Sequence, residues 1–292
     1  MNKKGLTASF IFEAESANYG ESVGNVAALK KISRGTGEAY TYISRQALRY
    51  NIIEQMGVAH TPLDVDGKVI QFHPDATIQD YPEIDLFGYM KTKKPARTRA
   101  AVVRLSNAIA LESFRSDMDF LTNKGLLDRY NQCTDEMKEG GNIAQSEIHK
   151  SYYTYTIAVD LNKVGIDPND GIEITNEEKT ARIHLLLDTI KFLYRDIKGR
   201  RENLSPLFAI GGVYDVKNPF FENKIKVVNN RLQIDPIESV LCLDEHVREK
   251  TRIGYMKGIF DNDREIEETL APVSIREFFA YLKEEVSTYY LR

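Results

Sequence analysis

Hydrophobic and polar residues alternate in several stretches of the chain, and this alternation predicts β-strands. The clearest stretch is 152–159, where aromatic and β-branched residues alternate with threonine and alanine. A short apolar run after Pro82, bounded by a lysine-rich segment, also favours a strand. The expected strands are 7–15, 85–90, 152–159 and 207–214. The last of these contains Gly211 and Gly212, which indicate either a packed neighbour or a backbone that faces a ligand.

Three helices are expected from apolar residues at helical spacing and from capping residues. The first covers 42–55, with Thr41 as its N-cap. The second begins after Thr175 or Asn176, ends at Gly199, and carries one apolar stripe that we expect in the core. The stripe consists of Ile183, Leu186, Leu187, Ile190, Leu193, Tyr194 and Ile197. The third begins with the capping box Ser274-Ile-Arg-Glu277 and is expected to bury Phe278, Leu282 and Val286.

The main elements follow the order strand, helix, strand, strand, helix, strand, which predicts an α+β protein with a ferredoxin-like, RRM-like βαββαβ core. We expect a single domain of residues 1–292. Its core comprises about 5–56, 85–105 and 150–215, with polar insertions at 57–84 and 106–149 and an acidic C-terminal extension with a helix at 216–292. This fold serves RNA-recognition domains and many enzymes, so it does not decide the chemistry. The paired aromatic residues with which RNA-recognition domains stack bases are missing from this sequence.

Composition is that of an ordinary globular protein, with 42% hydrophobic and 28% charged residues. No apolar run reaches the roughly 18 residues of a membrane span, and the N-terminus lacks the apolar centre of a signal peptide. Cys133 and Cys242 are far apart and have no metal-ligand spacing, which favours reduced thiols in a cytoplasmic protein. No phosphate-binding loop or dinucleotide fingerprint occurs, so neither a cofactor nor a metal site is expected.

Charge is unevenly distributed around a net value of −4. Residues 30–49 hold five cations against one acid, Glu38; the cations are Lys30, Lys31, Arg34, Arg45 and Arg49. Arg45 and Arg49 are four residues apart on one helix, next to a Gly-containing loop. Guanidinium groups pair with phosphate oxygens, and a helix N-terminus adds N–H donors, so this segment predicts a phosphate-binding surface. The alternative is a solvated basic face.

A second basic segment, 91–104, has six cations and no acid. It predicts a nucleic-acid contact, with a charged loop as the alternative. The side chains concerned are Lys91, Lys93, Lys94, Arg97 and Arg99. Residues 235–285 are acidic, with thirteen acids against seven bases, which leaves a protein-interaction module as a competing hypothesis. A metal-dependent ribonuclease is another, based on Asp64, Asp66, His73, Asp75, Asp80 and Asp85, although their spacing matches no ligand pattern.

Four segments occur in an order typical of one protein family. They are Tyr42-Ile-Ser-Arg-Gln-Ala-Leu-Arg49, Leu86-Phe-Gly-Tyr-Met90, Ala101-Val-Val-Arg-Leu-Ser-Asn-Ala-Ile-Ala110 and Ile143-Ala-Gln-Ser-Glu-Ile-His-Lys-Ser-Tyr-Tyr-Thr-Tyr155. Together with Asn18-Tyr-Gly-Glu-Ser22 they resemble the backbone subunit of type I CRISPR surveillance complexes (Cascade), in particular the DevR branch of type I-B systems. The resemblance covers most of residues 5–215.

The resemblance implies a non-catalytic subunit of antiviral defence that polymerises along CRISPR guide RNA and presents its bases to target DNA. The implied partners are guide RNA, target DNA, further copies of the chain and other Cascade subunits, with no membrane. Insertion 57–84 would be finger-like and 106–149 thumb-like. Apolar residues Phe120, Leu121, Leu126 and Leu127 are the candidates for a wedge between bases. The residues expected to hold RNA are Asn18, Lys30, Lys31, Arg34, Ser44, Arg45, Gln46, Arg49, Gly211 and Gly212.

Overall fold

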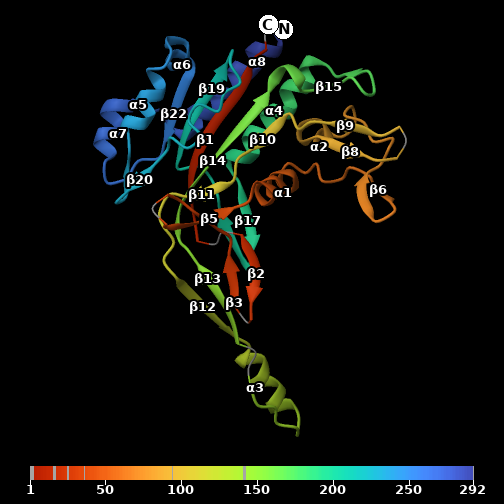
Figure 1. Ribbon diagram of the computed structural model, residues 1–292, viewed down its shortest axis with the longest axis vertical. Coiled ribbons are helices and arrows are strands. Elements are labelled where there is room, and N and C mark those ends of the chain that lie inside the picture. Colours follow the sequence, from red (N-terminus) through yellow and green to blue (C-terminus); the bar gives the residue numbers. More distant parts are fainter. Residues whose placement is uncertain are drawn as a thin grey trace.

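A computed structural model describes residues 3–15, 18–24, 26–35, 37–93, 95–140 and 143–291. The molecule has a broad body built on one large sheet, and a narrow arm that leads away from the body and ends in a helix (Figure 1). Both chain termini lie at the end of the body opposite the arm (Figure 1).

The large sheet has the strand order β22-β19-β1-β14-β11-β5-β4, with β10 also paired to β14. Its strands are β1 (Gly5–Ala14), β4 (Lys31–Ser33), β5 (Ala39–Ile43), β10 (Val103–Leu105), β11 (Ala108–Ala110), β14 (Ser151–Asp160), β19 (Phe208–Tyr214) and β22 (Thr251–Tyr255). All of these pairs are antiparallel. The longest pairing joins β1 to β14, from Gly5 opposite Asp160 to Ala14 opposite Ser151.

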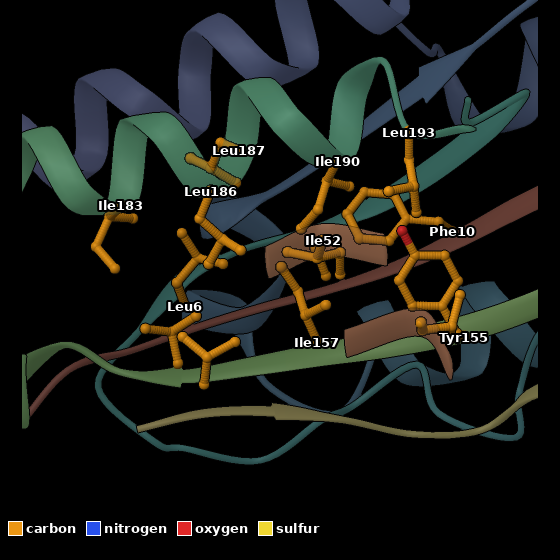
Figure 2. Packing of buried hydrophobic residues seen from close by; sticks show 14 of the residues in the cluster. Leu6, Phe10, Ile52, Tyr155, Ile157, Ile183, Leu186, Leu187, Ile190 and Leu193 are labelled. Carbon is orange, nitrogen blue, oxygen red and sulfur yellow. The ribbon is translucent and has the colours of Figure 1, made fainter. Parts of the chain in front are cut away.

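Three helices cover one face of this sheet: α1 (Arg45–Gln55), α4 (Asn176–Lys191) and α8 (Ile275–Leu291). Side chains alternate between the two faces of a strand, so Leu6 and Phe10 of β1 point to the helices together with Tyr155 and Ile157 of β14. They meet the apolar stripe of α4 and Ile52 of α1 in one core (Figure 2). The stripe residues Ile183, Leu186, Leu187, Ile190 and Leu193 are completely buried, as expected.

The chain order of the central elements is β1, α1, β10 and β11, β14, α4, β19, which is the predicted strand–helix–strand–strand–helix–strand order. Mixed α and β structure with an antiparallel sheet is thereby confirmed. The capping box of α8 is also confirmed, because the Ser274 backbone N–H donates to Glu277 Oε2 (2.9 Å) and the Glu277 N–H donates to Ser274 Oγ (3.2 Å).

The C-terminal part contributes to both faces of the sheet. A second core packs residues of 221–270 against Ile11 of β1, Phe208 and Ile210 of β19, and Ile253 of β22. Its elements are β20 (Val227–Val228), β21 (Arg231–Leu232), α5 (Asp235–Leu241), α6 (Glu245–Lys250) and α7 (Asp263–Leu270). On this face Thr154 and Ala158 of β14 stay partly exposed.

The arm is formed by β12 (Asp117–Thr122), α3 (Lys124–Cys133) and β13 (Ile143–Ile148). At its root β13 pairs in parallel with β3 (Val26–Leu29), which pairs with β2 (Tyr19–Val23). The order β12-β13-β3-β2 makes a second sheet, and none of its strands was predicted from the sequence.

The remaining strands form small hairpins around the body. These are β6 (Leu63–Asp66) with β7 (Val69–Phe72), β8 (Tyr89–Lys91) with β9 (Arg97–Arg99), β15 (Ile166–Asp167) with β16 (Ile172–Glu173), and β17 (Tyr194–Ile197) with β18 (Arg200–Asn203). Two short helices complete the chain, α2 (Pro82–Phe87) and the 3₁₀ turn η1 (Leu161–Lys163).

The strand expected at 85–90 is wrong. Pro82 stands at the first turn of α2, and Glu83 and Asp85 are acids in that turn, where they complement the helix dipole. Gly88 then ends the helix with a positive φ of 75°, and a strand begins only at Tyr89. The second strand of the central order is supplied instead by β10 and β11.

Two helix boundaries also differ from expectation. The first helix begins at Arg45 with Ser44 as its N-cap, because Thr41 lies in β5 with its hydroxyl bound to His149 and Tyr153. The second helix is capped by Thr175 as expected, but it ends at Lys191. Residues 194–203 form a hairpin instead, and its turn is made by Lys198 and Gly199, both at positive φ.

Candidate nucleic-acid interface

A groove of about 750 Å³ lies on the face of the sheet opposite α1, α4 and α8. Its floor comes from β10, β11 and β14, and one wall comes from residues 217–226, which follow β19. Five cations line it: Arg34, Arg45, Arg104, Lys217 and Lys226. Among the described residues of its lining Glu222 is the only acid, so the groove carries an excess of four formal positive charges. Such a surface favours a polyanion.

The N-terminus of α1 opens on this groove. Ser44 Oγ accepts the Ala47 N–H (3.3 Å), and Asn18 Oδ1 accepts the Ser44 N–H (2.6 Å). The Arg45 N–H donates to Asn107 Oδ1 (2.9 Å), while the Arg45 and Gln46 side chains are exposed. Asn18 and Ser44 therefore hold the helix end in place, and Arg45 is presented at the end where the helix dipole favours an anion.

The other cations predicted in 30–49 differ in availability. The Arg34 guanidinium lies 4.4 Å from the centre of the Tyr40 ring and its side chain is exposed. Lys31 instead forms an ion pair with Glu147 (Nζ to Oε1, 2.7 Å) and covers the Phe114 ring. Lys30 is half-buried. Arg34 is thus the cation of this segment that joins Arg45 at the groove.

Arg49 lies beside a different hollow. Its guanidinium stands 5.2 Å from the Phe87 ring, and burial lowers its pKa below the ordinary arginine value although the charge of Glu83 opposes this. The hollow beside it, about 450 Å³, is lined by the β6–β7 hairpin and by β8. The spacing of four residues therefore does not bring Arg45 and Arg49 to one site.

The floor of the groove is polar and made of small side chains. Thr154, Thr156 and Ser106 lie there, and Ser9 Oγ is 2.6 Å from Thr156 Oγ1. Tyr155 also borders the groove, but its ring is buried in the core on the opposite face. Among its described residues, the floor accordingly has no aromatic ring on which a base would stack.

The predicted contact by the basic segment 91–99 is wrong for Lys91 and Arg99. Lys91 is buried and donates to the carbonyl oxygens of Pro74 and Ala76, and burial lowers its pKa. Arg99 is buried against Asp85 (Nη2 to Oδ1, 2.7 Å). Lys93 pairs with Asp64 and Arg97 with Asp170, and Lys94 lies outside the described residues. The four described cations therefore each have a partner within the protein, which stabilises the hairpin region.

Gly211 and Gly212 occupy the middle of β19, which pairs with β1 on one side and β22 on the other. A Cβ at Gly211 would lie 2.2 Å from the Thr7 carbonyl oxygen, and one at Gly212 would lie 2.0 Å from the Lys250 carbonyl oxygen. Both residues are buried. Their positions support the alternative of a closely packed neighbour.

The acids of 64–85 do not converge. Asp64 pairs with Lys93, Asp66 accepts the Thr92 hydroxyl, and Asp85 is completely buried between two arginines. His73 and Asp75 lie on the surface, with Nδ1 and Oδ2 3.8 Å apart. In the part of the chain that the structure describes, no three His, Cys, Asp or Glu side chains are placed to hold a metal ion.

The wedge candidates are on the arm, as expected. Phe120, Leu121 and Leu126 are 62%, 69% and 58% exposed, and Leu127 is half-buried. Leu126 and Leu127 line a hollow of about 560 Å³ on α3, together with Tyr130. Large apolar side chains exposed in one segment are typical of a surface that binds a partner.

Sequence reasoning missed Lys217 and Lys226 altogether, because no local pattern links them to the other cations. Arg104 belongs to the basic segment 91–104 but was not chosen as a site residue. Only the arrangement of β10 and of the chain after β19 brings these residues to the groove.

Known proteins support the fold. A chain of the solved structure "CRISPR RNA-guided surveillance complex, pre-nicking" superposes with a TM-score of 0.64 at 11% identity, over 97% of this chain and 99% of that chain. A chain of another solved structure, "CRISPR RNA-guided surveillance complex", superposes with a TM-score of 0.60 at 13% identity, over 98% of this chain and 99% of that chain. No curated protein sequence matches. Within the described ranges, no helix is long and apolar enough to cross a membrane.

Residues 6–231 match the family of the CRISPR-associated negative auto-regulator DevR/Csa2. The match covers more than half of the chain and agrees with the resemblance seen in the motifs at 18–22, 42–49, 86–90, 101–110 and 143–155. The chain therefore belongs to the DevR/Csa2 family of CRISPR-associated proteins.

Proposed function

We propose that this protein is a non-catalytic, RNA-binding subunit of a CRISPR RNA-guided surveillance complex, and that copies of it polymerise along the guide RNA. Its partners are guide RNA, target DNA, further copies of itself and other subunits of the complex. The observation that carries the proposal is the cationic groove on the open face of the sheet, which includes the N-terminus of α1.

The chemistry of the groove suits the sugar-phosphate backbone. Phosphate contacts give affinity without reading sequence, which a subunit that accepts any guide requires. The described residues of the polar floor include the partly exposed Thr154 and supply no stacking surface, so the bases are free to face away toward a target strand.

The arm supplies a surface for a neighbouring copy. Its apolar residues Phe120, Leu121 and Leu126 are exposed and do not belong to the core of this chain. They belong to β12 and α3, which form the arm that leads away from the body (Figure 1). A contact between an arm and a different surface of the next copy is heterologous, and repeated contacts of this kind produce a filament.

The test is expression with a repeat-spacer transcript, followed by analysis of the RNA that co-purifies and of its nuclease protection. We expect RNA protected at regular intervals. Five cationic contacts at about 0.7 each give a slope of log affinity against log salt of about −3.5 on a single strand. A fourfold rise in salt then lowers affinity about a hundredfold.

The variant Arg34→Gln/Arg45→Gln should lose most of the RNA. The matched control is Lys191→Gln/Arg276→Gln, which removes two charges from α4 and α8 on the helix-covered face and should keep it. A nucleic-acid-free protein would refute the proposal and favour the protein-interaction hypothesis. RNA fragments that appear only with added divalent metal would favour the ribonuclease hypothesis.

A further inference from the structure

Arg104 and Lys217 of the groove belong to a cluster of charges around one carboxylate, at the C-terminal end of β14. Arg104 Nη1 lies 3.0 Å from Asp160 Oδ2, Lys163 Nζ lies 3.4 Å from the same oxygen, and Lys217 Nζ lies 3.2 Å from Oδ1. Three cations thus meet one acid. The cluster has a net formal charge of +2, whereas a structural ion pair is neutral.

The acid is inside and the cations reach outward. The Asp160 side chain is 9% exposed, whereas those of Arg104, Lys163 and Lys217 are 48%, 55% and 28% exposed. Burial acts to raise the pKa of Asp160, but hydrogen bonds and charges from Arg104 and Lys217 outweigh it and hold the pKa below its ordinary value. Asp160 is therefore ionised at neutral pH and positions the cations without cancelling them.

Lys217 is also fixed by the backbone around it. Its Cα, Cβ and Cγ atoms lie 3.0–3.3 Å from where a Cβ of Gly5 would stand, so the lysine stem packs closely against β1 and a side chain at position 5 would push it outward. Its ammonium group also donates to Asn162 Oδ1. A lysine held at its stem and at its end has lost much of its rotamer freedom before any ligand arrives.

The two cationic ends of the groove are separated along β14. The Ser106 N–H, next to Asn107 and the start of α1, donates to the Thr156 carbonyl oxygen, whereas Arg104 pairs with Ala158 and the cluster centres on Asp160. At about 3.4 Å per residue, the four residues from Thr156 to Asp160 span about 14 Å. The same continuous groove includes residues at both ends.

We propose that Arg104, Lys163 and Lys217, arranged by Asp160, form a second phosphate-binding site beside the groove, which seats an RNA backbone phosphate at the Asp160 end of β14, apart from Arg34 and Arg45. This inference rests on the proposed function. One copy then holds an RNA strand at two points, which keeps the strand extended across the polar floor between them. Asp160 is a positioning residue, since it contacts the cations and not the phosphate.

The experiment compares filter binding of a single-stranded RNA by the full-length wild type and by Arg104→Gln/Lys217→Gln at several salt concentrations. Loss of two contacts should make the salt slope less negative by about 1.4. Over a fourfold rise in salt the wild type should therefore lose about sevenfold more affinity than the variant. The charge-conserving variant Arg104→Lys/Lys217→Arg should keep the wild-type slope.

Controls separate this inference from the proposed function. Lys191→Gln/Arg276→Gln should match the wild type. If Arg34→Gln/Arg45→Gln makes the salt slope less negative but Arg104→Gln/Lys217→Gln does not, the cluster is a structural ion network and the inference is overturned, while the proposed function stands with fewer contacts in the groove. If neither pair changes RNA binding, both are overturned.

A variant that leaves Asp160 with fewer partners can lose stability, so melting temperatures are measured first. If the double variant does not fold, Lys217→Gln alone is used, because Arg104 and Lys163 still neutralise the carboxylate. It should change the slope by about 0.7, and an unchanged slope in this folded variant overturns the inference.

Discussion

Replacing Asp85 should show most clearly whether the acids of 64–85 have a structural or a catalytic role. Asp85 is completely buried, and it accepts from Arg99 Nη2 (2.7 Å) and Arg182 Nη1 (2.9 Å). It also accepts the Gly165 N–H at both oxygens (2.9 and 3.1 Å). One carboxylate thereby joins α2, β9, α4 and the loop before β15. It is the most buried of the acids that suggested a ribonuclease.

The variant Asp85→Asn keeps the shape of the side chain and removes its charge. The Arg99 guanidinium, on a side chain only 7% exposed, then loses the carboxylate that it pairs with. Arg182, on a side chain 3% exposed, keeps only the pair with the half-exposed Glu178. Removing one partner of a buried ion pair costs about 3–5 kcal/mol. At about 2.1 cal/mol/K per residue, unfolding of 292 residues has an entropy of about 0.6 kcal/mol/K, so 1 kcal/mol corresponds to about 1.6 °C. The melting temperature should therefore fall by about 5–8 °C.

The assay is urea and thermal unfolding followed by circular dichroism, with Asp75→Asn as the matched control. The Asp75 side chain is 92% exposed, so the same chemical change there should stay within about 0.5 kcal/mol of the wild type. If Asp85→Asn melts with the wild type, the buried network does not carry the stability assigned to it. If it is as stable as the wild type but loses a metal-dependent cleavage of RNA, Asp85 is catalytic and this reasoning is refuted.

Two further predictions concern the sheet and the root of the arm. Gly211→Ala should lower the free energy of unfolding by at least about 1–3 kcal/mol, because its Cβ would meet the Thr7 carbonyl oxygen at 2.2 Å. The fraction of the variant that folds should still bind RNA. A variant that is as stable as the wild type but loses RNA binding would contradict a purely structural role of Gly211. His149, at the root of the arm, has its pKa lowered by burial although the charge of Glu112 opposes this, so the unfolded chain takes up a proton first as pH falls. The free energy of unfolding should therefore decrease below about pH 6.5. Urea unfolding of the wild type and of His149→Gln at several pH values measures this, and the difference in unfolding free energy between them should shrink toward acid pH. A difference that is the same at every pH would exclude His149 as the cause.

Local patterns predicted the elements whose stability depends on one buried face. The alternation in 152–159 gave β14, the stripe from Ile183 to Leu193 gave the buried side of α4, and Ser274 with Glu277 gave the start of α8. In each case the spacing of residues in the sequence equals the repeat of the element itself. Motifs were sufficient for the family as well, which the match over residues 6–231 confirms.

Local patterns failed where a distant partner decides the role of a residue. The cations of 91–99 read as a free basic loop, but Arg99 is held by Asp85 and Lys91 by carbonyl oxygens of 74 and 76. Thr41 was predicted to cap a helix, but its hydroxyl is bound to His149, which is far along the chain. A charge or hydroxyl shows its chemistry in the sequence and does not show whether another group has already satisfied it.

The sequence by itself determined the class of fold and the family, since the patterns that indicate them lie within short segments of the chain. Only the tertiary structure decided which cations share a surface. Arg45 and Arg49 are one helical turn apart and line different hollows, whereas Arg104 and Lys217 come from distant segments and meet at Asp160. The physical reason is that the pairing of β10, β14 and β1 sets these distances, and strand pairing joins residues without regard to their separation along the chain.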